Sequence, residues 1–168
     1  MRQHPFFFGD RPNVDPLSDI LALLEPRSYR VGGFEAGGGW SIRFGAHDVG
    51  IKCYAVTAGS CWITVDGAGP PVLLDEGDCF LLPHGWPFQI ASDLNLPAED
   101  YEPYFVGSPE GTVVKLNDGG EVTVLGSHFQ FAGPHATMLL ALLPPLVHLH
   151  SETDRATLRW SFDRMSVV

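Results

Sequence analysis

Short runs in which apolar and polar residues alternate fill the middle of the chain, from residue 29 to residue 131. In residues 40–44, the apolar side chains of Trp40, Ile42 and Phe44 alternate with polar ones, which is the two-residue period of a strand with one face in solvent. Glycine-rich turns such as Gly37–Gly39 separate the runs. The pattern predicts nine strands: Tyr29–Val31, Trp40–Phe44, Ile51–Val56, Cys61–Val65, Val72–Leu74, Asp78–Leu82, Phe88–Ala91, Val113–Leu116 and Val122–Phe131.

The strand pattern predicts a mainly β fold. Eight or nine strands within about 100 residues, with no helical spacing between them, favour a closed barrel or a sandwich. The polar, proline-broken segment Leu94–Gly111 predicts a long surface loop. A chain of 168 residues has room for one domain. We divide it into an N-terminal helix and entry (15–28), a barrel (29–131) and C-terminal helices (134–168).

Helical spacing is found only at the two ends of the chain. After Asp15-Pro16, a favourable helix start, apolar residues follow at helical intervals until Pro26. The segment His135–Leu143 is apolar on nearly every side, so we expect this helix to be deeply buried or to pack against a partner. A last helix carries one apolar stripe, Leu158, Phe162 and Met165.

Composition and charge narrow the class of protein. The chain has 10 basic and 20 acidic residues, a formal net charge of −10, so we expect no direct binding to nucleic acid by this chain. No apolar run approaches the ~18 residues that a membrane span requires, and we expect no membrane partner. The three cysteines form no C-x-x-C pair, which favours reduced thiols in a cytoplasmic protein.

The most specific local motif is Gly77–Gly85, a glycine, five residues, a proline, any residue and a second glycine, with Asp78 directly after the first glycine. Its first glycine predicts a tight turn with positive φ. The motif resembles the second conserved motif of the cupin superfamily, and Tyr54–Trp62 resembles the end of the first. The resemblance implies a cupin-like double-stranded β-helix barrel.

In cupin enzymes the two motifs supply a His-x-His pair, a Glu and a further His, which together hold a metal ion. When Gly59 is aligned with the last glycine of the first motif, Lys52 stands at the position of the Glu. The paired histidines then fall at Ala46 and Asp48, or at Gly45 and His47, and Phe88 stands at the position of the last His. A protonated lysine has no lone pair for a metal. We therefore expect no metal, no cofactor and no enzymatic activity.

Over about residues 15 to 165 the chain resembles the N-terminal cupin domain of bacterial AraC-type transcription regulators. In that family this domain precedes two helix-turn-helix units and is taken to sense an effector or to dimerise. The 168 residues show no helix-turn-helix pattern, which leaves open whether the chain is a fragment or a self-contained protein. The blocks that carry the resemblance are Asp15–Leu21, Ile51–Val56, Gly59–Trp62, Gly77–Pro83, Phe88–Asp93 and Gly133–Pro145.

An effector of unknown identity would bind inside the barrel, where large side chains can line a concave site. The alternative is that these side chains simply fill the barrel. Lys52 and Tyr54 are two residues apart on the same predicted strand, so their side chains face the same side of the sheet, and Lys52 could contact an acidic effector. We nevertheless expect its ammonium to extend to the surface. The candidate ligand-binding residues are Trp40, Lys52, Tyr54, Trp62, Phe80, His84 and Phe88.

The C-terminal helices are the candidate dimer interface, and the resemblance favours a homodimer. The alternative is that they cap one end of the barrel. The candidate interface residues are Leu139, Leu142, Leu158, Phe162 and Met165.

The sequence thus predicts the ligand-sensing and dimerisation domain of an AraC-type regulator. One alternative is a stand-alone small-molecule-binding cupin. Another is a metal-dependent cupin enzyme that uses His84, His128 and either His148 or His150. His128 and His135 flank a turn and could also meet.

Overall fold

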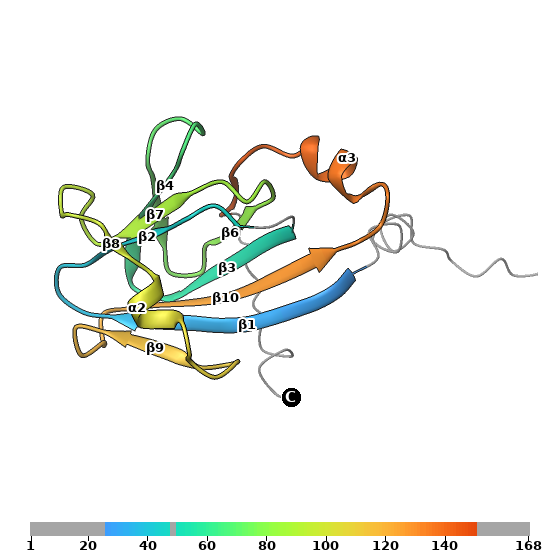
Figure 1. Ribbon diagram of the computed structural model, residues 1–168. Helices are drawn as coiled ribbons and strands as arrows, with labels where there is room; N and C mark the ends of the chain where they lie inside the picture. Colours follow the sequence, from blue (N-terminus) through green and yellow to red (C-terminus); the bar gives the residue numbers. More distant parts are fainter. Residues whose placement is uncertain (1–25, 48–49, 151–168) are drawn as a thin grey trace, which may run out of the picture.

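The protein is described by a computed structural model over residues 26–47 and 50–150. Two β-sheets face one another, and β9, β1, β10 and β3 run side by side in the larger sheet (Figure 1). The predicted N-terminal helix and the predicted last helix, with Leu158, Phe162 and Met165, lie outside the described residues.

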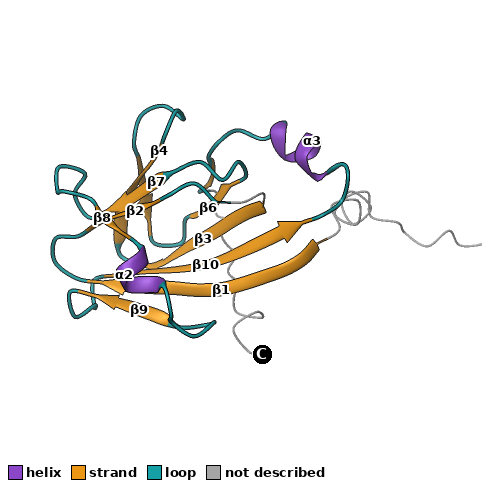
Figure 2. Ribbon diagram, viewed as in Figure 1, coloured by secondary structure: helices purple, strands orange, loops and turns teal. Residues whose placement is uncertain are grey.

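All nine predicted strands are present, and two more strands accompany them. Figure 2 shows how strands dominate the described part of the chain. The strands are β1 (Pro26–Ala36), β2 (Ser41–Phe44), β3 (Gly50–Ala58), β4 (Ser60–Val65), β5 (Val72–Asp75), β6 (Cys79–Leu82), β7 (Phe88–Ala91), β8 (Glu99–Asp100), β9 (Val113–Leu116), β10 (Val122–Phe131) and β11 (Val147–Leu149).

The larger sheet has the order β11-β6-β3-β10-β1-β9 and the smaller one β5-β4-β7-β2-β8. The pairings of β1 with β9 and of β2 with β8 are parallel, and the other pairings are antiparallel. Strand β1 is much longer than its predicted core because it pairs with β10 along its whole length, from Pro26 opposite Phe131 to Ala36 opposite Val122.

The inward faces of both sheets share one hydrophobic core. Phe34 and Phe80 of the larger sheet are buried together with Ile63 and Phe88 of the smaller one. The rings of Phe44 and Phe88 are stacked, with centroids 4.6 Å apart. This core holds the two sheets face to face.

The turn of the second motif has the predicted geometry. Gly77 has φ +91°, which favours glycine. The side chain of Asp78 is 3% exposed, and its Oδ2 accepts a hydrogen bond from the backbone N–H of Asp75 at 3.0 Å. The motif's first glycine and acid thus close the turn between β5 and β6.

The structure corrects two expectations about the connections. The segment Leu94–Gly111 is not only a loop, because it contains β8 and the short helix α2 (Glu102–Phe105). The predicted helix at residues 135–143 is shorter, α3 (Ala136–Ala141), and of its two alternatives the structure contradicts deep burial, while packing against a partner stays a prediction. Its Met138 is 60% exposed, and Leu142 just after it is 78% exposed.

Candidate ligand-binding site

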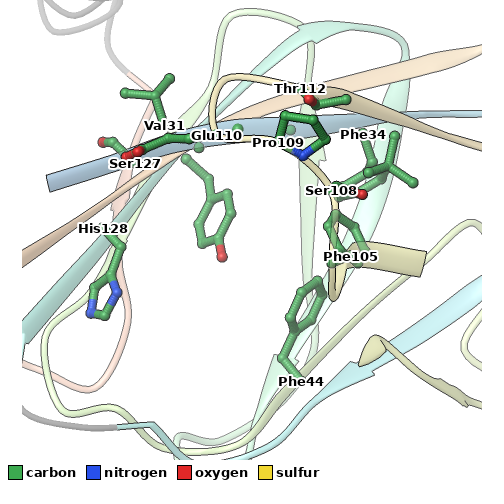
Figure 3. Close-up of a pocket in the computed structure, with 15 residues that line it drawn as sticks. Val31, Phe34, Phe44, Phe105, Ser108, Pro109, Glu110, Thr112, Ser127 and His128 are labelled. Atoms are coloured by element: carbon green, nitrogen blue, oxygen red, sulfur yellow. The ribbon is translucent and has the colours of Figure 1, made fainter. Parts of the chain in front are cut away.

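A cavity of about 350 Å³ lies on the inner side of the larger sheet, beside α2 and β9. Strands β1 and β10 form one wall, and residues 108–112 close over it. Figure 3 shows the ring of His128 on one side of the cavity and the rings of Phe44 and Phe105 on the other. The volume falls within the range of ~300–1,000 Å³ typical of small-molecule sites.

The cavity exists because two registered positions of the sheet lack side chains. Gly32 of β1 lies opposite Gly126 of β10, which lies opposite Tyr54 of β3. Residues opposite one another in a sheet present their side chains to the same face. Since Tyr54 lines the cavity, Gly32 leaves open space on the cavity side of the sheet, and Gly126 makes room there for the ring of Tyr54.

Tyr54 connects the cavity to the core. Its ring is stacked on Phe80, with centroids 5.0 Å apart and planes at 19°. Burial, the largest cause, raises the pKa of the Tyr54 phenol well above its usual value. The hydroxyl therefore stays protonated near neutral pH, where it can donate a hydrogen bond to a bound molecule.

The prediction that Lys52 extends to the surface was wrong. Its Nζ lies 5.4 Å from the ring centroid of Phe44 and 5.2 Å from that of Phe88, distances at which a cation is attracted to an aromatic face. Burial lowers the pKa of the ammonium to about 8. Within the described residues, neither of the two ion pairs, Arg43–Asp66 and His148–Asp78, involves Lys52. A half-buried positive charge therefore lies beside Phe44, a cavity residue.

Two histidines lie close to this ammonium. His128 is directly opposite Lys52 in the pairing of β10 with β3 and lines the cavity. Its ring meets that of His47, rather than His135, with centroids 5.2 Å apart and planes at 87°. Burial, then the charges of Lys52 and His128, lower the pKa of His47 to about 4. His47 is therefore neutral at neutral pH.

The residues at the positions of the cupin metal ligands do not fit a metal ion. An ammonium and a phenyl ring, from Lys52 and Phe88, lie together there. Among the residues that the structure describes, there is no group of three His, Cys, Asp or Glu side chains able to hold a metal.

The histidines of the enzyme alternative have separate partners. Nε2 of His84 donates to the backbone oxygen of Leu143 at 2.7 Å, and its ring is stacked on Trp86. Nε2 of His148 donates to Oδ2 of Asp78 at 3.0 Å. The ring of His150 lies against that of His148, with centroids 4.9 Å apart. None of these three lines the cavity with His128.

Of the seven candidate ligand-binding residues, the structure places only Tyr54 in the cavity lining, with Lys52 beside it. Trp40, Phe80 and Phe88 are buried in the core, as in the filled-barrel alternative. The expectation that Trp62 and His84 face the barrel interior was wrong. Trp62 is 37% exposed because the alternate residues of β4 face the core, and His84 is held in the turn before β7.

Sequence reasoning missed most of the lining. Part of it comes from the predicted surface loop Leu94–Gly111, which contributes Phe105, Ser108, Pro109 and Glu110. Thr112 follows this loop and immediately precedes β9. A usable signal was the pair Gly32-Gly33 beside a predicted strand, since glycine inside a strand often marks a close approach or a missing side chain. Other missed lining residues are Val31, Phe34, Phe44, Val114, Gly126, Ser127 and His128.

Comparison with known proteins places this fold. A family model described as cupin matches residues 15–167, and the chain belongs to that cupin family. The chain is 37% identical over 149 residues to an AraC-like transcription regulator of Streptomyces lividans and equally to one of Streptomyces antibioticus. Each match covers 88% of this chain and 48% of the regulator, so the chain spans about half the length of these curated relatives.

Among solved structures, ToxT from Vibrio cholerae O395, bound to (E)-4-(8-methylnaphthalen-1-yl)but-3-enoic acid, matches with a TM-score of 0.49 and 9% identity. That match covers 83% of this chain and 49% of ToxT. A search of the described residues for a helix long and apolar enough to cross a membrane found none.

Proposed function

We propose that this chain is the ligand-sensing and dimerisation domain of an AraC-type transcription regulator whose DNA-binding part lies outside these 168 residues. The observation that carries the proposal is the 37% identity to two AraC-like regulators over 149 residues. The cavity supports the ligand-sensing role, because a sensing domain needs a site for its effector.

The domain binds its effector without reacting with it and acts in the cytoplasm, where its target DNA lies. Lys52 and Phe88 replace the ligands through which a metal would act, so cupin metal chemistry is not supplied by these residues. The buried thiols are equally unsuited to nucleophilic chemistry, since burial raises the pKa of Cys53 and of Cys61 to about 12.

The effector acts by a population shift between two arrangements of the domain. The contact available for this shift is the row of registered residues Tyr54, Phe80 and His148 across β3, β6 and β11. A bound molecule that moves the ring of Tyr54 also displaces Phe80, because the two rings are stacked. Phe80 lies opposite His148, so the displacement reaches β11. Strand β11 ends at Leu149, directly before the C-terminal segment.

Dimerisation uses the C-terminal helices. The exposed side chain of Leu142 and the half-buried one of Leu139 supply the described part of the interface. An apolar side chain exposed beside a helix that buries only Ala136 and Leu140 is suited to a two-fold contact between copies. The other proposed interface residues, Leu158, Phe162 and Met165, lie outside the described residues.

The test is the intact mass of the natural gene product, measured on protein purified from its own cells, together with retention of promoter DNA. We expect roughly 30 kDa, because a DNA-binding domain of about 100 residues would be added to the 18.3 kDa of this chain, and we expect DNA to be retained. A mass of 18.3 kDa with no DNA retained would contradict the proposal and favour a stand-alone binding protein.

A substitution at Gly32 tests the ligand-sensing role separately from DNA binding. A Cβ added at Gly32 would have only the backbone oxygen of Thr112, at 3.6 Å, within contact distance. Gly32→Leu should therefore fold and fill the cavity. In the natural gene it should abolish the response of the regulated promoter to effector, while a retained response would place the effector site elsewhere.

A further inference from the structure

We infer that the effector is a small organic monoanion, an apolar body carrying one carboxylate, and that Lys52 binds the carboxylate. This inference rests on the proposed function, because it assigns the chemistry of the molecule that the cavity takes.

A lysine inside a protein is normally paired, because an isolated buried ammonium loses most of its hydration. In the described part of the chain Lys52 has no carboxylate within ion-pair distance. The rings of Phe44 and Phe88 attract the ammonium but bring no negative charge. A carboxylate supplied from outside would complete this site.

The ammonium lies where a bound molecule can approach it. Phe44 contacts the ammonium and also lines the cavity, and His128 is the registered neighbour of Lys52 and lines the cavity as well. A carboxylate bound between Phe44 and His128 could approach the ammonium and accept a hydrogen bond from the imidazole of His128.

The charge of the site selects a monoanion. The groups that titrate around it are Lys52, His47 and His128, with Tyr54 on the same strand and Glu110 at the rim. His47 and Tyr54 are neutral at neutral pH, and the ammonium of Lys52 is the positive charge that anchors the ligand. A dianion such as a phosphate monoester would bring its second negative charge towards the carboxylate of Glu110, which also lines the cavity.

The body of the ligand must be apolar. Beyond the charged end, the cavity presents the aromatic rings of Phe34, Phe44 and Phe105 and the aliphatic side chains of Val31 and Val114. Such walls stabilise a hydrocarbon or aryl body by removing it from water.

Titration calorimetry on the 168-residue chain tests the inference with a defined probe series: naphthoate and the straight-chain carboxylates from hexanoate to dodecanoate, each beside its primary amide. The carboxylates should bind at least about tenfold tighter than their amides. Lys52→Met should remove that preference and leave the binding of the amides unchanged. Lys115→Met, at an exposed lysine of β9, is the matched control and should change neither.

The dependence on pH gives a second readout. For the wild-type chain, the dissociation constant of the best carboxylate should rise about tenfold per pH unit above pH 8, where Lys52 loses its proton. It should stay flat for the amide and for Lys52→Met.

The outcomes separate this inference from the proposed function. If amides bind as tightly as carboxylates and Gly32→Leu abolishes both, the cavity senses a neutral molecule and the assignment of Lys52 is wrong. If carboxylates bind equally to wild type and Gly32→Leu, they bind outside the cavity and the inference is overturned. If no carboxylate of the series binds at millimolar concentration, the inference is overturned too, while the mass and the DNA retention still decide the proposed function.

Discussion

The ring of Tyr54 lies directly against the backbone of Gly126, its registered neighbour on β10. A Cβ added at Gly126 would come within 2.5 Å of Cε1 and 2.6 Å of Cδ1 of that ring. Glycine is therefore required at this position by the aromatic ring that covers it. The same ring lines the cavity and is stacked on Phe80, so the shape of the cavity depends on residues that also form the core.

The first prediction follows from this contact. Gly126→Ala should displace the Tyr54 ring and lower the free energy of unfolding by about 1–3 kcal/mol, the usual cost of overpacking, as measured by urea denaturation. Gly32→Ala is the control in the same row, because its Cβ would meet only the Thr112 oxygen at 3.6 Å. It should stay within about 0.5 kcal/mol of wild type. Equal losses in the two variants would show that Tyr54 does not depend on Gly126.

The second prediction concerns the stability cost of Lys52. Burial lowers its pKa from 10.5 to about 8, so the unfolded chain holds this proton more tightly than the folded one. Lys52→Met should therefore raise the free energy of unfolding at pH 7, by up to about 3 kcal/mol. A matched Lys115→Met substitution should leave it nearly unchanged. A lower free energy of unfolding in Lys52→Met would mean that the ammonium, in its position between Phe44 and Phe88, stabilises the folded chain.

The same shift fixes a pH dependence. Between pH 8 and pH 10.5 the unfolded chain binds more protons at Lys52 than the folded chain does, so the contribution of this group rises with pH there. The thiols and Tyr54 act in the opposite direction. The difference between wild type and Lys52→Met isolates the lysine, and the advantage of the variant should shrink as pH rises through this window.

The strands could be predicted from the sequence and the cavity could not. Alternation reports which face of a strand is buried, and it located all nine predicted strands, three of them with the observed bounds: Phe88–Ala91, Val113–Leu116 and Val122–Phe131. The cavity depends on the register that aligns Gly32, Gly126 and Tyr54, which lie far apart in the sequence. No local pattern encodes that register.

The position of the Lys52 side chain could not be predicted from the sequence either. Its strand parity with Tyr54 indicates that it faces inward, but the general tendency of lysine to reach solvent favours the surface. The structure resolves this conflict through Phe44 and Phe88, whose rings are brought to the ammonium by a different sheet. Conflicts between local preference and global position are expected at functional sites.

The third prediction concerns acid stability. The pKa of His47 falls from 6.5 to about 4 in the folded chain, so on acidification the unfolded chain takes up this proton first. His47 should thus lower the free energy of unfolding as pH falls from 6.5 towards 4, with no further effect below. His47→Leu should show a shallower loss over this window in urea titrations. His135→Leu, an exposed control, should follow wild type, and a parallel loss in all three chains would contradict the assignment.

The fourth prediction tests the proposed dimer. Leu142→Glu places a charge at a side chain that is 78% exposed in one copy, so it should leave the fold intact and give monomers by light scattering. Leu73→Glu, at a leucine 42% exposed on β5, is the control and should leave dimers. Dimers that persist in Leu142→Glu, or a wild-type chain that is already monomeric, would show that this surface is not the interface.

The fifth prediction concerns the attachment of β11. Only three residue pairs join β11 to β6, with His148 opposite Phe80. The hydrogen bond from Nε2 of His148 to Oδ2 of Asp78 adds a side-chain link, and it is part-buried. A hydrogen bond to a charged group contributes about 1.5–3 kcal/mol. His148→Leu should therefore speed amide hydrogen exchange in Val147–Leu149 by about tenfold or more.

His150→Leu is the control for this variant, because the ring of His150 touches that of His148 and no hydrogen bond to Asp78 is lost with it. It should leave the exchange of Val147–Leu149 within a few-fold of wild type. The amides of β3 and β10 should be unaffected in both variants, because their ladder does not involve β11. Faster exchange throughout the larger sheet would mean that His148 supports the whole domain. That result would contradict a role for β11 as a separately released strand between the cavity and the C-terminal segment.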